Sequence, residues 1–175
     1  TPLEIRLTSQ AWANEQAFIW RQRRLAGIQR RDKGVSFVGR VIVSAEEKNI
    51  FWRYNFVDNQ LLFSIYHMNP ENLPKYVNKF NEWKCDYIQG YPSAIYLMAQ
   101  FALDNGLQLH QPRSIFTSSE KLHPHQRWAI EKAFGAKLWD FYGSVERAGI
   151  ITECEAGNYH VNIESGILEV INNEF

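Results

Sequence analysis

Apolar residues recur at helical spacing in the middle of the chain, where the pattern of hydrophobic and polar positions is clearest. Four positions fall on one helical face and predict an amphipathic helix that begins near Asn72. These positions are Leu73, Val77, Phe80 and Lys84. Residues 94–106 are apolar almost all round and predict a buried helix, which the Asn-Gly pair at its end closes.

Capping signals mark two further helices. The first follows Thr8 or Ser9, either of which suits a helix N-cap, and it ends at Gly27. The second begins at Pro124 and ends at Gly135, which follows the usual preference for proline at the start of a helix and glycine after its end.

Short runs of β-branched and aromatic residues predict the strands. They cover residues 35–43, 61–67, 85–91, 114–119 and 136–143. The aromatic run at residues 49–56 is ambiguous between helix and strand. Helix and strand alternate three times between residues 73 and 143, with short connections. This alternation predicts an α/β fold with a mostly parallel sheet and right-handed crossover helices.

The pattern changes after Gly149. Residues 158–164 and 166–171 alternate between apolar and polar positions on either side of Ser165 and Gly166, which predicts a C-terminal antiparallel hairpin. By its length the chain is expected to form one domain over residues 1–175.

Composition and charge exclude several classes of function. The 175 residues are 45% hydrophobic and carry 19 basic and 19 acidic side chains, so no net field attracts nucleic acid or an anionic membrane. The stretch of residues 21–33 is locally basic. We interpret it as a solvated helix face and its exit loop and not as a polyanion site. No apolar run reaches the length of a membrane span. Two cysteines, Cys85 and Cys154, and no signal peptide indicate a reduced, cytoplasmic protein.

Polar residues gather where the predicted parallel strands end. In open α/β sheets, ligands bind at this edge. Four strand ends carry hydroxyls, glycines, aromatic rings or acids, namely residues 66–69, 90–93, 117–120 and 142–146. This clustering favours a ligand site over four unrelated solvated loops.

Each type of side chain at this edge suits a chemical task. Glu146 and Glu120 offer carboxylate oxygens, the ligands that Mg²⁺ prefers. Tyr142 offers a ring on which a flat base can stack, although core packing explains it equally well. Gly143 permits close approach of the backbone to a ligand. His67 can donate a hydrogen bond to an oxyanion or a carboxylate, but a histidine satisfied within the fold is the favoured interpretation.

Other kinds of chemistry are less well supported. Ser118, Ser119 and Ser144 lie outside any G-x-S-x-G motif, so a hydrolase nucleophile is not predicted. Cys154 and His160 supply at most half of a metal site. The sequence contains no Gly-rich phosphate loop of the P-loop or dinucleotide type.

Three stretches of the sequence together resemble a known enzyme family. They are YIQGYPSAIYLMAQF from Tyr87, IFTSSEKLHPHQRWAIEKAFGAKLWDFYGSVE from Ile115, and ECEAGNYHVNIESGILEVI from Glu153. The chain resembles the phenylacetate–coenzyme A ligases, and most of all their branch associated with capsular polysaccharide biosynthesis, in the adenylate-forming superfamily. The resemblance implies a two-step reaction. A carboxylic acid attacks the α-phosphate of ATP, and a thiol, typically coenzyme A, then takes the acyl group.

The resemblance also implies roles for residues at the predicted edge. Glu146 would bind the Mg²⁺ that bridges the phosphates and, together with His67, would take part in catalysis. The nucleotide would be bound by Ser118, Ser119, Glu120, Tyr142, Gly143 and Ser144. The acyl pocket would be bordered by His67, Tyr66, Tyr91 and Pro92.

One position departs from the family pattern. A threonine or serine usually precedes the glutamate and reaches the α-phosphate, whereas this chain has Val145, which cannot donate a hydrogen bond. Loss of one charge-assisted hydrogen bond costs about 1.5–3 kcal/mol. Either another donor substitutes, or this branch handles phosphate differently, or activity is reduced.

The same resemblance implies that the chain is the central part of a larger N-terminal domain. The family's phosphate loop would precede Thr1, and a mobile domain with a catalytic lysine would follow Phe175. We therefore expect the 175 residues alone to be inactive, and their open sheet edges to permit a homodimer. Two alternatives remain: a non-catalytic nucleotide-binding module on the same scaffold, and a transferase in surface polysaccharide biosynthesis.

Overall fold

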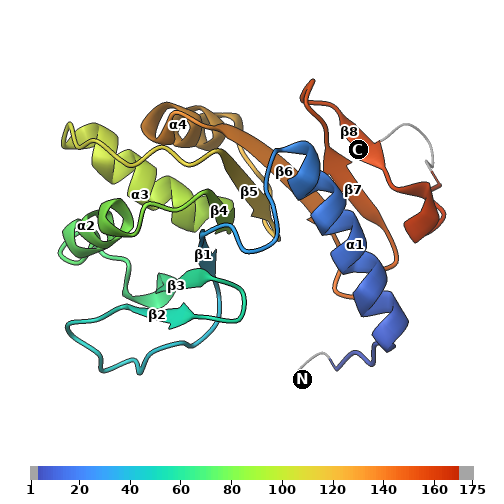
Figure 1. Cartoon of the computed structure of the whole chain (residues 1–175), viewed down its shortest axis with the longest axis horizontal. Coiled ribbons are helices and arrows are strands. Elements are labelled where there is room, and N and C mark those ends of the chain that lie inside the picture. The colour runs from blue at the N-terminus through green and yellow to red at the C-terminus, as the bar shows by residue number, and fades with distance from the viewer. Residues whose placement is uncertain (1–3, 170–175) are drawn as a thin grey trace.

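The computed structural model describes residues 4–169, which form one mixed eight-stranded sheet with helices on both faces (Figure 1). The strands are β1 (Gly34–Val38), β2 (Trp52–Asn55), β3 (Gln60–Ser64), β4 (Tyr87–Gly90), β5 (Ser114–Ser118), β6 (Lys137–Gly143), β7 (Ile150–Glu153) and β8 (Tyr159–Val161). The α-helices are α1 (Ser9–Leu25), α2 (Leu73–Trp83), α3 (Pro92–Asp104) and α4 (Pro124–Phe134), and the short 3-10 helices are η1 (Ile65–His67) and η2 (Ile163–Ser165). Within this described part of the chain, no helix has both the length and the apolarity needed to cross a membrane.

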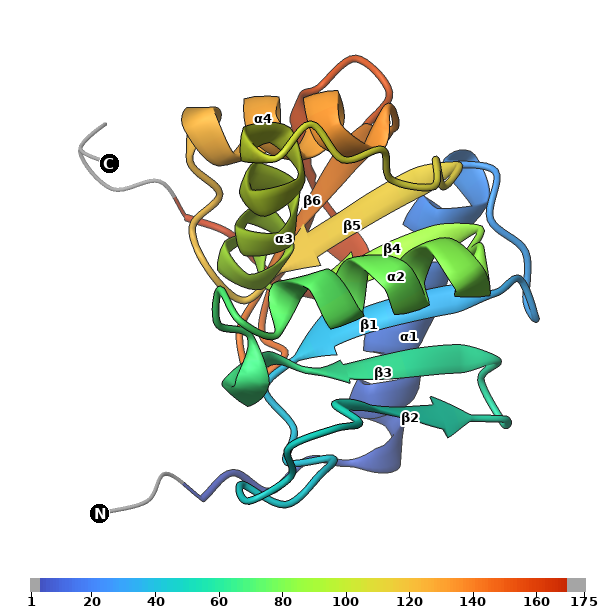
Figure 2. The same ribbon diagram turned by 90° about the vertical axis from the view of Figure 1, so that its left-hand side faces the viewer.

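The strand order is β2-β3-β1-β4-β5-β6-β7-β8. Strands β3, β1, β4, β5 and β6 run parallel, and β2, β7 and β8 pair antiparallel with their neighbours. Helices α2, α3 and α4 connect successive parallel strands and lie on one face of the sheet (Figure 2). They share this face because right-handed crossovers that advance in one direction place every helix on the same side. The predicted α/β fold with a mostly parallel sheet is confirmed.

The main core lies between the sheet and helices α2 to α4. Val35, Ile88 and Leu138 are fully buried there, one from each of three parallel strands. Phe37 and Phe63 meet edge to face across β1 and β3, with ring centroids 5.1 Å apart, which is a preferred geometry for aromatic pairs. This packing fixes the level at which neighbouring strands end.

The predicted helix boundaries are confirmed for α1 and α4. The Thr8 hydroxyl oxygen accepts a hydrogen bond from the backbone N–H of Ala11 at 3.1 Å, so Thr8 is the N-cap of α1. Gly135 closes α4 in the left-handed conformation, with a φ of 61°. Helix α4 begins at Pro124, as predicted.

Lys84 does not belong to the buried face of α2, contrary to the prediction. The helix ends at Trp83, and Lys84 caps it in the left-handed conformation with a φ of 53° and an exposed side chain. This conformation costs an L-residue about 1–2 kcal/mol, a cost that glycine avoids.

We expect Lys84→Gly to raise the free energy of unfolding by about 0.5–1 kcal/mol, because glycine's larger unfolded-state entropy offsets part of the relieved strain. Urea denaturation measures the change. Asn78→Gly, at an exposed position inside the same helix, should instead lower stability. A loss of stability in Lys84→Gly would contradict the assignment of strain to this cap.

Two predicted strands are too long. β1 ends at Val38 rather than at residue 43, and β3 ends at Ser64, after which residues 65–67 form the 3-10 helix η1. Val38 and Ser64 are paired with each other, and β4 ends at Gly90, close to the same level. In the described part of the chain the sheet offers no parallel partner beyond this level. The backbone therefore leaves the sheet despite its β-branched composition.

The predicted C-terminal antiparallel hairpin is confirmed, but other segments form it. β7 lies in a stretch without a strand prediction, and β8 covers only part of the predicted residues 158–164. The second predicted strand, residues 166–171, is not a strand over residues 166–169, and residues 170 and 171 lie outside the described residues.

The hairpin turn forms earlier than predicted. The backbone N–H of Cys154 donates to the carbonyl of Asn158 at 2.9 Å, and Gly157 adopts a φ of 80°. A glycine in the left-handed region supports this tight turn. Where the turn was predicted, Ser165 is instead the last residue of the 3-10 helix η2, and Gly166 caps that helix.

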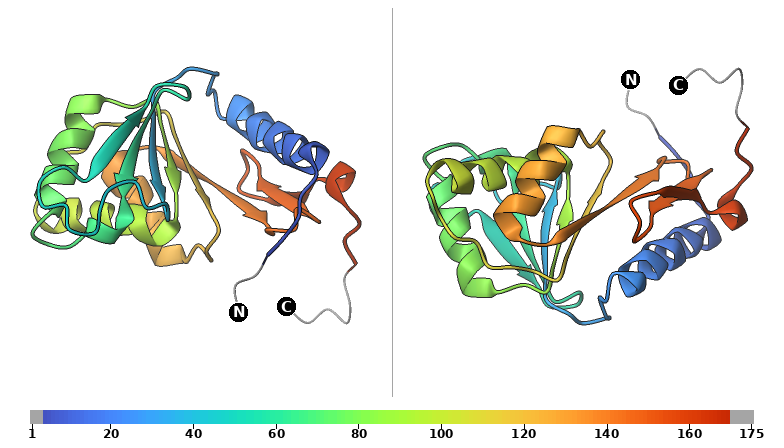
Figure 3. Two further views of the ribbon diagram at one scale, coloured as in Figure 1. Left: turned by 90° about the horizontal axis from the view of Figure 1, so that it is seen from below. Right: turned by 90° about the horizontal axis from the view of Figure 1, so that it is seen from above.

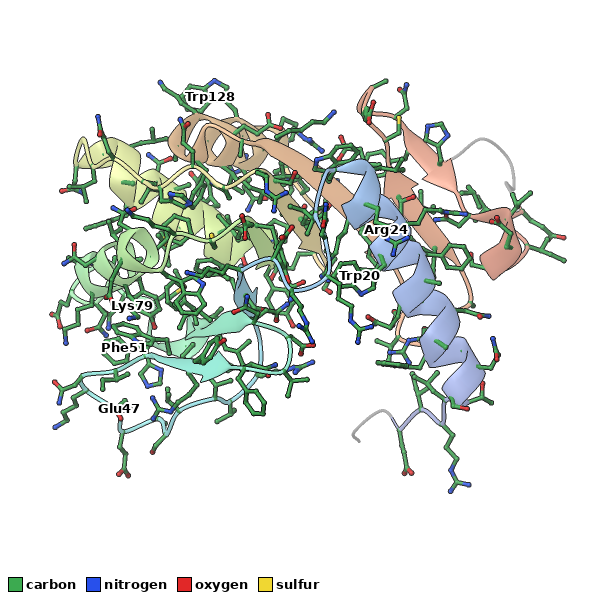
Figure 4. All side chains as sticks on the ribbon, viewed as in Figure 1. Trp20, Arg24, Glu47, Phe51, Lys79 and Trp128 are labelled. Carbon is green, nitrogen blue, oxygen red and sulfur yellow. The ribbon has the colours of Figure 1, made fainter. Side chains whose placement is uncertain are left out.

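Helix α1 lies on the opposite face of the sheet from α2 to α4, beside β7 and β8 (Figure 3). Its arginines are not all solvated, contrary to the prediction. Arg23 lies against the rings of Trp20, Tyr87 and Phe116 and donates to the side chain of Gln89. Burial lowers the pKa of its guanidinium. Figure 4 shows Trp20 on the side of α1 that faces the parallel strands.

Candidate functional site

The turn after β6 presents the predicted acid, Glu146, to solvent. The backbone N–H of Arg147 donates to the carbonyl of Ser144 at 3.0 Å, so Val145 and Glu146 occupy the two central positions of a β-turn. Both side chains are exposed, Val145 to 66%. A carboxylate at this position is accessible to a cation.

Tyr142 is the predicted stacking residue at the end of β6. Its side chain is 61% exposed, so its ring is not part of the core and is accessible to a flat ligand. Gly143 follows it, and a Cβ at this position would lie 2.9 Å from Cε1 of the Phe141 ring. The glycine therefore accommodates Phe141, a reason that the sequence does not reveal.

The residues after β5 form a strained turn. Ser119 has a φ of 71°, a conformation that costs an L-residue about 1–2 kcal/mol, and its hydroxyl oxygen lies 3.4 Å from that of Ser118. Strain of this kind concentrates at functional sites. Glu120 accepts a hydrogen bond at Oε2 from the backbone N–H of Ser93 at 3.1 Å, in the first turn of α3. The helix dipole favours a carboxylate there, so Glu120 has a structural role at α3.

His67 is held in a fixed orientation at the end of β3. Its Nδ1 lies 2.8 Å from the hydroxyl oxygen of buried Ser64, and its ring stacks on Phe51 with centroids 5.1 Å apart. The hydroxyl of Tyr76 donates to the carbonyl of Ser64 at 2.6 Å and fixes the position of Ser64 in turn. One ring nitrogen of His67 is thus satisfied within the fold, as its favoured interpretation predicted, while the half-buried ring remains accessible.

Tyr66 and Tyr91 both lie next to Gly39, just beyond the end of β1. The Tyr66 hydroxyl donates to the carbonyl of Gly39 at 3.2 Å. A Cβ on Gly39 would lie 3.0 Å from the hydroxyl oxygen of Tyr91, so the missing side chain makes room for this ring. Pro92 directly follows Tyr91 and is buried at the first position of α3.

The predicted site residues form two groups along one edge. The arrowheads of the parallel strands point to this edge in Figure 2. Tyr66 and His67 follow β3, and Tyr91 follows β4. The second group, residues 118–120 and 142–146, lies at the ends of β5 and β6. β3 and β6 are four strand positions apart, which corresponds to about 19 Å at the usual strand spacing. A ligand that contacts both His67 and Glu146 must therefore be extended.

A buried polar network lies beneath the end of β6. Asp140, two residues before Tyr142, accepts hydrogen bonds from the hydroxyls of Thr117 at 2.6 Å and Tyr159 at 2.8 Å. These contacts join β5, β6 and β8. Burial and the Asp140 carboxylate raise the pKa of the Tyr159 hydroxyl.

Glu153 completes this network and is only 3% exposed. Its Oε2 accepts hydrogen bonds from the backbone N–H of Asp140 at 2.7 Å and from the guanidinium of Arg127 at 2.8 Å. Burial opposes the charge on Arg127, but the hydrogen bond and charge of Glu153 raise its pKa overall. Gln22 of α1 donates to the carbonyls of Asp140 and Glu153 at 2.8 and 3.1 Å. The side chains of Glu153 and of Gln22 in α1 thus satisfy the backbone where β6 and β7 separate, and Arg127 of α4 pairs with the Glu153 carboxylate.

Residues 4–169 contain no group of three or more His, Cys, Asp or Glu side chains that could hold a metal ion. Cys154 and His160 do lie near each other on the β7–β8 hairpin. A hydrogen bond from the backbone N–H of Asn158 and the nearby side chain of His160 lower the pKa of the Cys154 thiol. Burial raises the pKa of the Cys85 thiol instead. Within the described residues, no third His, Cys, Asp or Glu side chain joins Cys154 and His160 to complete the predicted half-site.

Several residues around the site could not be predicted from the sequence. Glu15 of α1 forms an ion pair with Arg147 of the turn, with Glu15 Oε2 2.6 Å from Arg147 Nε. The Asp140 and Glu153 network is equally long-range. No periodicity or motif marks such contacts, because their partners lie far apart in the chain. The Ser64–His67 contact, by contrast, joins residues only three positions apart.

Comparisons with known proteins identify relatives of the chain. No protein-family profile matches it. Protein CapK of Staphylococcus aureus is 39% identical over 145 residues, which are 82% of this chain and 32% of that protein. The structure of 2-hydroxyisobutyryl-CoA ligase in complex with 2-HIB-AMP and CoA matches 86% of this chain and 35% of its own, with a TM-score of 0.55 and 21% identity. The anthranilate CoA ligase AuaEII in complex with anthranoyl-AMP matches 82% of this chain and 27% of its own, with a TM-score of 0.55 and 13% identity.

The chain spans about a third of the length of the relatives it matches. Homology with CapK is visible in the sequence, whereas the solved structures share the fold alone. The solved structures confirm the fold that the resemblance to adenylate-forming enzymes implies. The chain is therefore a homologue of Protein CapK, and it has the fold of part of the CoA ligases of known structure.

Proposed function

We propose that this chain forms the nucleotide and acyl edge of an AMP-forming carboxylic acid ligase that uses ATP, Mg²⁺ and coenzyme A. The observation that carries the proposal is the turn after β6. It presents exposed Glu146, close to exposed Tyr142 in β6 and to strained Ser119 after β5, at the carboxyl edge of a parallel sheet. The relatives support it, since two of them are CoA ligases in complex with acyl-AMP compounds.

The nucleotide would bind at the ends of β5 and β6. Tyr142 would stack on the adenine ring, and Ser118, Ser119 and Glu120 would line the pocket that receives it. One carboxylate, Glu146, suits Mg²⁺ in this setting, because the ion commonly takes one or two protein carboxylates and fills its other positions with phosphate oxygens and water. When bound, Mg²⁺ neutralises phosphate charge.

The acyl group would bind toward the ends of β3 and β4. His67, whose ring is fixed by Ser64 and Phe51, would donate a hydrogen bond to the substrate carboxylate, with Tyr66 and Tyr91 bordering the acyl group. The span of about 19 Å between β3 and β6 suits an extended acyl-nucleotide.

The proposed reaction has two steps. The carboxylate oxygen of the acid attacks the α-phosphorus of ATP and pyrophosphate leaves, which gives the acyl-adenylate. The thiol of coenzyme A then attacks the acyl carbon, and AMP leaves with the electrons of the broken bond. The protein would act through positioning and electrostatic stabilisation of the phosphates. We further propose that segments flanking residues 1–175 complete the site with a phosphate loop and a catalytic lysine.

Val145 supports a second candidate, a nucleotide-binding module without chemistry. Its exposed, apolar side chain occupies the turn position next to Glu146, where a hydroxyl would reach phosphate. Isothermal titration of ATP and Mg²⁺ into the complete protein separates the candidates when it is combined with an exchange assay. Binding without acyl-adenylate formation favours the module, and no binding of either nucleotide or acid contradicts both.

We expect Val145→Thr to raise ATP–pyrophosphate exchange by the complete protein about tenfold, because it adds a charge-assisted hydrogen bond to phosphate. Val145→Ala serves as the matched control and should leave the rate near that of the wild type. No gain in Val145→Thr would show that another donor already serves the α-phosphate.

A further inference from the structure

Helix α1 contacts strands β6 and β7 and the turn between them, here called the β6–β7 arm, through a face that carries two polar residues. Glu15, Phe18 and Gln22 lie three and four residues apart, so they share a face of the helix. Phe18 and Gln22 are buried, and Glu15 is largely so. α1 runs alongside β6 and β7 in Figure 1. This face therefore packs on the arm that ends in the turn carrying Glu146.

The two polar residues of this face hold opposite ends of the arm. Gln22 donates to the carbonyls of Asp140 and Glu153, where β6 and β7 separate. Glu15 accepts from Nε of Arg147, in the turn beyond β6. The seven residue steps from Glu15 to Gln22 advance about 10 Å along the helix, and the three residue steps from Asp140 to the end of β6 advance about 10 Å along the strand. The helix thus spans the distance that its two contacts require.

The contact at the turn is a shielded ion pair. The side chains of Arg147 and Glu15 are 19% and 16% exposed, whereas Arg21 and Glu164, another ion pair of the same helix, are 48% and 59% exposed. Shielded pairs are screened less by water and salt. Arg147 also adopts a φ of 57°, a conformation that an L-residue keeps only when its surroundings hold it.

We propose that the Glu15–Arg147 pair positions the turn that presents Val145 and Glu146. Arg147 directly follows Glu146, and its backbone N–H closes the turn onto Ser144. Arg147 therefore holds the turn through its backbone N–H and also through its side chain. The side chain anchors the turn to α1, a helix at the other end of the described chain. Both members are positioning residues, and their catalytic consequence rests on the proposed function.

Hydrogen–deuterium exchange of the backbone at residues 144–149 tests the positioning directly. In Glu15→Gln the turn should exchange about tenfold faster, with little change in α2 to α4. Glu164→Gln, which breaks the exposed pair of the same helix, should leave the turn unchanged. The swapped variant with Glu15→Arg and Arg147→Glu should restore part of the protection. Unchanged exchange in Glu15→Gln, or an increase spread evenly over the whole fold, would overturn the proposal.

Kinetics of the complete protein give the second readout. Glu15→Gln should raise the apparent KM for Mg²⁺ in ATP–pyrophosphate exchange about tenfold, with partial rescue by the swap and no effect of Glu164→Gln. An unchanged Mg²⁺ dependence in Glu15→Gln would overturn the catalytic consequence of positioning. A wild-type protein without any exchange activity would contradict the proposed function, and the deuterium exchange comparison would still decide the role of the pair.

Discussion

Glu146→Gln should lower ATP–pyrophosphate exchange by the complete protein roughly 10²–10³-fold, the usual effect of removing one group that stabilises transition-state charge. Glutamine keeps the size of the side chain and removes the charge that holds Mg²⁺. Because Glu146 is exposed at the corner of a turn, the substitution should leave the fold unchanged. The loss of activity should therefore appear without a loss of stability.

The matched control for Glu146 is Glu155→Gln. Glu155 is an exposed acid on the β7–β8 turn, at the opposite end of β7 from the Glu146 turn, and its replacement should alter neither exchange nor its Mg²⁺ dependence. Raising Mg²⁺ should recover part of the activity of Glu146→Gln, since a weakened site is filled by mass action. Wild-type exchange by Glu146→Gln, with unchanged Mg²⁺ dependence, would show that another group holds the metal.

Glu153→Leu should lower the free energy of unfolding by about 3–5 kcal/mol, which is the typical cost of removing one partner of a buried ion pair. The substitution leaves the Arg127 guanidinium without its buried partner and the backbone N–H of Asp140 without an acceptor. Urea denaturation measures the change, with the same slope expected for wild type and variant.

The controls for Glu153 separate charge from hydrogen bonding. Glu153→Gln keeps an acceptor for the backbone N–H and should cost less than Glu153→Leu. Glu164→Gln breaks an exposed ion pair of similar chemistry and should cost no more than about 1 kcal/mol. Equal stability of Glu153→Leu and wild type would mean that the network does not hold β6 to β7.

Much of the fold is predictable because its signals are local. Thr8, Gly27, Pro124 and Gly135 mark helix ends through backbone conformation and capping, and the alternation of helices and strands implies the parallel sheet. Strand lengths are not local. β1 stops at Val38 because its neighbours stop there, although the sequence continues with valine and isoleucine.

The candidate site also has features that local sequence signals predict and features that depend on long-range contacts. Its place at the carboxyl edge follows from topology, so Tyr142 and Glu146 could be proposed from the sequence. The contacts that shape it are long-range. Glu15 meets Arg147, and Glu120 caps α3, only after the chain has folded. The hairpin was misplaced because Gly157 and Ser165–Gly166 are both plausible turns, and tertiary packing chooses between them.

The central claim is that this chain carries the nucleotide edge of an acid-activating ligase. ATP–pyrophosphate exchange by the complete protein, measured across a panel of carboxylic acids, tests it most directly. We predict exchange that depends on the acid and on Mg²⁺, and no exchange by the 175-residue chain alone. Nucleotide binding without exchange for any acid, or exchange by the isolated chain, would contradict the account.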